Sequence, residues 1–162
     1  HPLPTIAVCP AMDPGITMKQ IDSGWFGYRL FFVRKWHRAL RAKQLAFPDQ
    51  YRFEQALRLR TVSALTDLFV AEHTDFASTS DYFDAYALTG NALQGTRATI
   101  VYAEDDPVIP SAGFLNLPDS VTLTPVARGG HCAFVEQLGQ PSWIDRVLVR
   151  SFSETLKSKS AD

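Results

Sequence analysis

Three short runs of apolar and mostly β-branched residues constrain the fold of this chain more than any other feature. They lie far apart in the sequence, at 5–9, 98–103 and 121–126, and Pro, Gly or Asp residues stand beside them. Such runs are typical of strands buried in a parallel sheet, where the connections between strands are long and commonly helical. Pro125 predicts that the third strand is short or bent. The pattern predicts an α/β fold with parallel strands.

The long stretch between the first two runs is predicted to be almost wholly helical. In the segment 21–45, Tyr28, Phe32, Trp36 and Leu40 recur every four residues and form one apolar stripe. Further helices are expected at 50–60, 62–71 and 81–88, with a loop at 73–80, and a closing helix at 142–157. Residues 14–91 therefore form a helical insertion in an α/β core made of residues 1–13 and 92–162.

The composition excludes several classes of protein. The formal net charge is −1, with 46% hydrophobic and 20% charged residues, which favours a globular domain and argues against nucleic acid as a partner. No apolar run is long enough for a transmembrane segment. The two cysteines form no C-x-x-C pair and favour a reducing, cytoplasmic location.

One basic surface leaves an alternative open. Arg34, Lys35, Arg38 and Arg41 lie mostly opposite the apolar stripe and could dock on an anionic membrane or on nucleic acid. We favour a solvated helix face, because the whole chain is slightly acidic.

Two motifs carry the candidate chemistry. Asp106 lies in the acidic segment directly after the second predicted strand, and His131 follows a Gly-Gly pair after the third. The carboxyl ends of parallel strands meet at one edge of a sheet, where reactive groups gather. A carboxylate on one ring nitrogen of a histidine fixes the tautomer, so that the other nitrogen can act as a general base. Each motif alone is more often structural, but their order and placement together favour a catalytic pair.

These motifs, together with Ala7-Val8-Cys9-Pro10-Ala11-Met12-Asp13, Leu65-Thr66-Asp67-Leu68-Phe69 and Asp81-Tyr82-Phe83, resemble the YheT-like family of predicted hydrolases. The resemblance implies the C-terminal part of an α/β-hydrolase sheet, with residues 14–91 as a helical cap. It implies that Asp106, four positions before Pro110, is the catalytic acid, with Asp105 as the less favoured alternative, and that His131 is the general base. It also implies a small-molecule ester substrate, an acyl lipid among the candidates, and neither a cofactor nor a metal.

The nucleophile that such an enzyme needs is not in the sequence. No G-x-S-x-G segment occurs, so the serine and the oxyanion hole are expected upstream of His1, and residues 1–162 alone are expected to be inactive. Cys132 is not favoured as a substitute, because it adjoins His131 and neighbouring side chains of an extended loop point apart. A binding module derived from a hydrolase is the alternative function.

Three further expectations follow from the residues. His1, His37 and His73 are scattered and are predicted to be surface residues, and no spacing of ligands predicts a metal site. The opening at His1, directly before a strand, is expected to mean a chain cut from a longer one. A three-stranded sheet would also leave strand edges that predict self-association.

Overall fold

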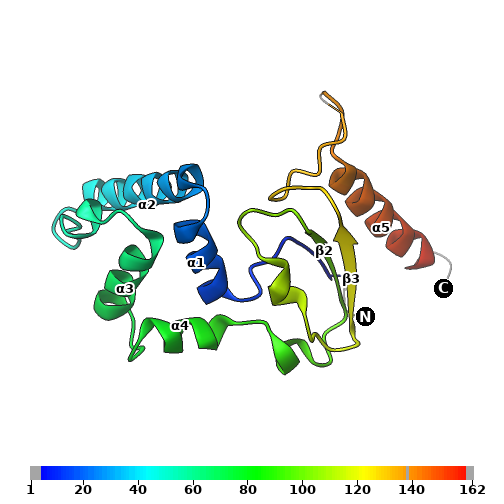
Figure 1. The fold of residues 1–162 in the computed structure, drawn as a ribbon, viewed down its shortest axis with the longest axis horizontal. Coiled ribbons are helices and arrows are strands. Elements are labelled where there is room, and N and C mark those ends of the chain that lie inside the picture. The colour runs from blue at the N-terminus through cyan, green and yellow to red at the C-terminus, as the bar shows by residue number, and fades with distance from the viewer. Residues whose placement is uncertain (1–4, 138, 160–162) are drawn as a thin grey trace. The chain divides into compact units, whose positions relative to one another are not determined.

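A computed structural model describes residues 5–137 and 139–159 of the chain, so His1 lies outside the described residues. The chain forms two compact units (Figure 1). The first unit combines residues 1–12 with residues 88–162, and the second comprises residues 13–87. The sequence prediction placed these boundaries at 13/14 and 91/92.

The first unit contains a three-stranded sheet in which all strands are parallel. The strands are β1 (Thr5–Val8), β2 (Ala98–Ala103) and β3 (Val121–Val126), in the order β1-β2-β3. Thr5 pairs with Ala98, and Ala98 pairs with Val121, so the three strands start in register. The predicted α/β fold with parallel strands is therefore confirmed.

The central strand β2 holds the core of this unit. Ile100, Val101 and Ala103 are at most 2% exposed. The short 3-10 helix η3 (Ser111–Phe114) brings the Phe114 ring onto Tyr102, with 4.1 Å between the ring centroids and 18° between their planes. Phe114 is itself only 2% exposed, so the loop after β2 is anchored directly in the core.

The remaining elements of the first unit are a short 3-10 turn and the closing helix. The turn η2 (Gly90–Leu93) precedes β2, and the helix α5 (Trp143–Lys159) ends the described chain. Ser142 and Asp145 form a reciprocal N-terminal cap, in which each side chain accepts from the other residue's backbone N–H. The cap explains why the predicted helix begins here.

The second unit is helical. The helix predicted at 21–45 is present as α2 (Phe26–Ala46), but its predicted start is wrong, because residues 21–23 belong to a separate helix, α1 (Pro14–Ser23). Gly24 ends α1 in an extended conformation, and its N–H donates to the Gln20 carbonyl at 2.9 Å. A Cβ at Gly24 would lie 2.7 Å from that oxygen, so only glycine permits this turn.

The prediction of a helix at 50–60 is wrong. The structure has only the 3-10 turn η1 (Ala56–Arg58) there. The backbone N–H of Phe53 donates to Oε1 of Gln44 instead of to a helical carbonyl, at 2.8 Å. Phe53 and Ala56 are buried with Val33 and Leu65, so this segment contributes its apolar residues to the core without being a helix.

The unit is completed by α3 (Val62–His73) and α4 (Thr79–Tyr86), close to the predicted 62–71 and 81–88. A long-range contact fixes the start of α3. The Asp22 carboxylate accepts hydrogen bonds from the backbone N–H groups of Val62 and Ser63, each at 2.8 Å. A carboxylate at a helix N-terminus satisfies unpaired donors and interacts favourably with the helix dipole.

The four basic residues of α2 that were predicted to face solvent are exposed: Arg34, Lys35, Arg38 and Arg41.

His37 of α2 is a core residue, and its predicted place on the surface is wrong. It is 4% exposed. Burial, which penalises the charged ring, is the main reason that its pKa lies below the usual 6.5, and the positive charges of Arg41 and Arg60 lower it further. The carbonyls of Ala56 and Leu59 act in the opposite direction. The fold therefore favours the neutral imidazole.

We expect the free energy of unfolding to decrease as the pH falls below about 6.5, the pKa of a free histidine. Below that value the unfolded state binds a proton that folded His37 does not, so acid favours unfolding; above it both states are neutral and the effect vanishes. The slope is at most about 1.4 kcal/mol per pH unit. Urea denaturation between about pH 5 and pH 7.5 measures it, with His37→Gln as the control. An unchanged pH dependence in His37→Gln would contradict the assignment.

Candidate active site

Asp106 lies in the turn that follows β2, and the backbone around it fixes its carboxylate. Oδ1 accepts hydrogen bonds from the N–H groups of Val108 at 2.8 Å and Ile109 at 2.9 Å. The Asp106 side chain is 1% exposed. Both donors belong to buried residues, so the carboxylate is held by backbone groups of the core. Its second oxygen remains free for another partner.

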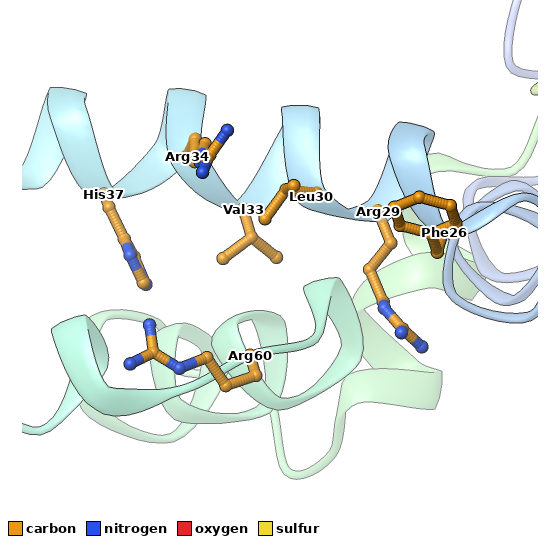
Figure 2. Close-up of a pocket in the computed structure, with 7 residues that line it drawn as sticks. All are labelled: Phe26, Arg29, Leu30, Val33, Arg34, His37 and Arg60. Carbon is orange, nitrogen blue, oxygen red and sulfur yellow. The ribbon is translucent and has the colours of Figure 1, made fainter.

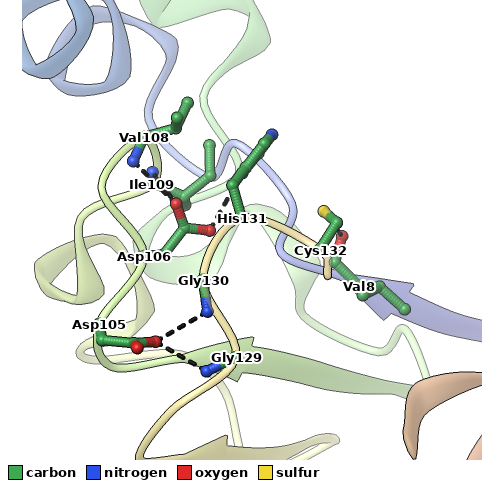
Figure 3. Close-up of polar contacts among 9 residues, drawn as sticks. All are labelled: Val8, Asp105, Asp106, Val108, Ile109, Gly129, Gly130, His131 and Cys132. Carbon is green, nitrogen blue, oxygen red and sulfur yellow. Dashed lines mark hydrogen bonds and ion pairs between the residues drawn. The ribbon is translucent and has the colours of Figure 1, made fainter. Parts of the chain in front are cut away.

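That partner is His131, which follows β3. Nδ1 of His131 lies 3.1 Å from Oδ2 of Asp106 (Figure 3). An ionised carboxylate can only accept, so in the neutral ring Nδ1 carries the hydrogen and Nε2 is left as an acceptor. Figure 3 shows the far side of the ring turned away from Asp106, and the side chain is 37% exposed. The structure thus brings both predicted site residues together, from two adjacent strands.

Asp105 has a separate role that the sequence analysis did not assign. One of its oxygens, Oδ1, accepts from the N–H groups of Gly129 at 2.8 Å and Gly130 at 2.9 Å (Figure 3). These two hydrogen bonds lower the pKa of Asp105 below its usual 3.8. Asp105 therefore ties the acid turn to the loop that carries His131. The Gly-Gly pair is the signal in the sequence, because its two backbone N–H groups can donate to one carboxylate oxygen.

The two glycines are needed for different reasons. A Cβ at Gly129 would lie 2.5 Å from two ring carbons of Phe134, so the position allows no side chain without displacement of that buried ring. Gly130 has φ +55°, a left-handed conformation that L side chains rarely adopt. The backbone turns at Gly130, directly before His131.

Replacing Asp105 with Ala is expected to loosen the loop that carries His131. The amide hydrogens of Gly129 and Gly130 lose their acceptor, so their exchange with solvent should rise several-fold, as measured by NMR. Asp105→Asn keeps an acceptor oxygen and should restore part of the protection. Because the pKa of Asp105 is lowered on folding, its stabilising effect is complete above about pH 3.8 and is lost as the pH falls through the lower folded value. Unchanged exchange in Asp105→Ala would show that the loop is held by other contacts.

The two cysteines lie near this site, and their side chains differ in environment. Burial raises the pKa of Cys9 to about 11, so its thiol is neutral at physiological pH. Cys132 has φ +62°, and its Sγ lies 3.9 Å from the carbonyl oxygen of Val8, so the thiol is directed toward the end of β1 (Figure 3). Both are free cysteines.

No family model, curated protein or solved structure matches the chain. The case for a function therefore depends on the geometry of the site.

No group of three or more His, Cys, Asp or Glu side chains is arranged to hold a metal ion in the described ranges. No helix in the part of the chain that the structure describes is long and apolar enough to cross a membrane.

Proposed function

We propose that this chain supplies the acid and the general base of a Ser-His-Asp triad that hydrolyses carboxylic esters, in a YheT-like α/β-hydrolase with a helical cap. The observation that carries the proposal is the 3.1 Å contact between Nδ1 of His131 and the buried carboxylate of Asp106. This is the orientation that a base in acyl transfer requires, because it leaves Nε2 accessible.

The chemistry assigns a role to each of the two residues. Nε2 of His131 takes the proton of a serine hydroxyl as that oxygen attacks the ester carbonyl, and later returns it to the leaving alcohol. Asp106 stays ionised and stabilises the imidazolium that forms between these steps. The two backbone N–H groups on Oδ1 prevent the carboxylate from rotating away from the ring. Asp105 positions the loop and does not contact the reacting atoms.

The serine and the oxyanion hole are proposed to come from residues outside 1–162. No G-x-S-x-G segment occurs in this sequence. A fluorophosphonate probe tests the proposal, because it labels only an activated serine. We expect no labelling of residues 1–162 alone, and labelling together with hydrolysis of short-chain aryl esters when the upstream segment is present. A longer protein that does neither would refute the proposal.

A second candidate function is a non-catalytic binding module derived from a hydrolase, because residues 1–162 contain no G-x-S-x-G segment. The residue at the nucleophile position of the longer protein discriminates between the two. Serine there supports the enzyme, and a residue with no nucleophilic group supports the binding module.

The partners in this proposal are a small-molecule ester and, through strand edges, a second copy of the chain. Among the described residues, β1 and β3 each pair on one side only. Unpaired edges favour association between chains, which sedimentation at high protein concentration measures. A cytoplasmic location belongs to the same proposal.

A further inference from the structure

The solvent-facing side of α2 combines exposed apolar residues with basic residues. Four apolar residues at the start of the helix are between 42% and 65% exposed: Trp25, Phe26, Leu30 and Phe31. A single exposed apolar residue is common, whereas neighbouring ones mark surfaces that bind a partner. These four residues, together with the exposed Arg34, Lys35 and Arg38, are called the α2 surface below.

The apolar and the basic groups of the α2 surface share one face of the helix. A groove of about 310 Å³ is lined by both kinds: Gly27, Leu30, Phe31, Arg34, Lys35 and Arg38. Nζ of Lys35 lies 5.5 Å from the centroid of the Phe31 ring. A Cβ at Gly27 would lie 2.3 Å from a ring carbon of Trp25, so the indole ring lies directly over that glycine. Trp25 therefore adjoins the groove.

The opposite side of α2 packs against the rest of the second unit. Val33 and His37 are each 4% exposed. Figure 2 shows both side chains directed toward the segment that carries Arg60, whereas Arg34 does not extend toward it. The core of the unit is thus formed by the other side of the helix, and the α2 surface is not part of it.

The charge of α2 has a single sign. Residues 23–48 contain no Asp or Glu but six basic residues: Arg29, Arg34, Lys35, Arg38, Arg41 and Lys43. The whole chain has 16 basic and 17 acidic residues, so this segment is strongly basic within a slightly acidic protein. None of the ion pairs between described residues includes one of these six. A local cluster of cations attracts an anionic surface whatever the net charge of the molecule.

These two properties together fit the surface of an anionic lipid bilayer. A bilayer presents phosphate groups to cations and, directly beneath them, acyl chains to apolar side chains. A nucleic acid offers the phosphates but no apolar layer for Leu30. A second copy of the chain offers an apolar surface, but a symmetric pair would bring the same cations face to face, which is unfavourable.

We propose that the α2 surface docks on an anionic lipid membrane. Arg34, Lys35 and Arg38 bind lipid phosphate groups, and the four apolar side chains insert between the headgroups. The sequence favoured a simple solvated face because it could not show which apolar residues are exposed beside these cations. The proposal does not depend on hydrolysis, since every residue that it uses lies in the second unit.

Sedimentation of the 162-residue chain with lipid vesicles tests the proposal. We expect saturable binding to vesicles made of equal amounts of phosphatidylcholine and phosphatidylserine. Vesicles of phosphatidylcholine alone should bind at least about tenfold more weakly, because each basic residue near an anionic surface contributes a factor of about five. Added salt should also weaken the binding, since it screens exposed charges.

Two double variants test the basic residues. Arg34→Gln/Arg38→Gln should bind the anionic vesicles at least about tenfold more weakly. Arg52→Gln/Arg58→Gln is the matched control, because it removes the same charge from exposed residues of the second unit that do not line the groove. It should bind nearly as the unmodified chain does. Equal losses in the two double variants would overturn the proposal.

A second pair of variants tests the apolar residues. Leu30→Ser/Phe31→Ser should also bind at least about tenfold more weakly, because the inserted apolar area is lost. The control is Leu115→Ser/Phe152→Ser, which removes one leucine and one phenylalanine that are 65% and 44% exposed in the first unit. All four side chains are exposed, so both variants should fold normally. Equal binding by the two variants would overturn the proposal.

Three further results would overturn it and identify another occupant. Binding to single-stranded RNA that is as tight as binding to the anionic vesicles would indicate a nucleic-acid surface. A self-associated chain that Leu30→Ser/Phe31→Ser converts into a monomer would assign the α2 surface to a second copy. Loss of vesicle binding in a longer protein that includes the proposed nucleophile would mean that the added segment covers this surface.

Discussion

In a protein that includes the proposed nucleophile, His131→Ala is expected to lower the turnover of an aryl ester about 10⁶-fold. Removal of the ring leaves no group to take the serine proton. Asp106→Asn should lower turnover about 10⁴-fold, because an amide NH₂ that faces Nδ1 favours the tautomer in which Nε2 carries the hydrogen and cannot act as a base. Steady-state kinetics on the purified variants measures both effects.

The control is Glu104→Gln, which removes a carboxylate from the same turn. Glu104 is exposed, so the variant should retain nearly full turnover. A loss as large as that of Asp106→Asn would show that the total charge of the turn matters, and not the contact between Asp106 and His131. On residues 1–162 alone, ¹⁵N NMR of the His131 ring should report hydrogen on Nδ1 in the unmodified chain and on Nε2 in Asp106→Asn. The same tautomer in both would contradict the mechanism.

Phe114→Ala is expected to have the largest effect on stability, a loss of about 3–5 kcal/mol in the free energy of unfolding. Phe114 is 2% exposed and stacks on Tyr102 of the central strand. The substitution removes a whole ring and leaves a cavity that the adjacent strand cannot close. Phe114 anchors the loop that begins near Asp106. The contact between Asp106 and His131 should therefore be lost at a lower denaturant concentration than in the unmodified chain. Urea denaturation monitored by circular dichroism measures the change.

The neighbouring residue provides the control for Phe114. Leu115 is 65% exposed, so Leu115→Ala should change the free energy of unfolding by less than about 0.5 kcal/mol. Equal effects of the two substitutions would mean that the loop is not anchored by the buried ring.

The sequence was most informative where local chemistry and strand order were sufficient. The runs at 98–103 and 121–126 form strands with those bounds, because β-branched and apolar residues between turn residues have few alternatives. Once these strands are parallel neighbours, the residues after them must lie at the same edge. Asp106 and His131 could therefore be paired from their positions alone, although the distance between them could not.

Sequence patterns failed where a distant group competes with local preference. The apolar residues at 50–60 predicted a helix. Instead, the Gln44 side chain accepts a hydrogen bond from the Phe53 N–H, and the apolar side chains of Phe53 and Ala56 are buried in the core. The spacing in 21–45 predicted one helix, yet the cap at Gly24 divides it. Periodicity identifies which residues are apolar at helical spacing, but not where the backbone turns.

By itself, the sequence determined the parallel strands, the helical insertion and the placement of an acid and a histidine at one sheet edge. Only the tertiary structure decided that Asp106 faces the imidazole while Asp105 accepts from Gly129 and Gly130, and that His37 is buried. The physical reason is that strand formation and strand order depend on residues close in sequence. The choice between two adjacent carboxylates, and the burial of one histidine among scattered ones, depend on which distant backbone and side-chain groups the fold brings within a few ångströms.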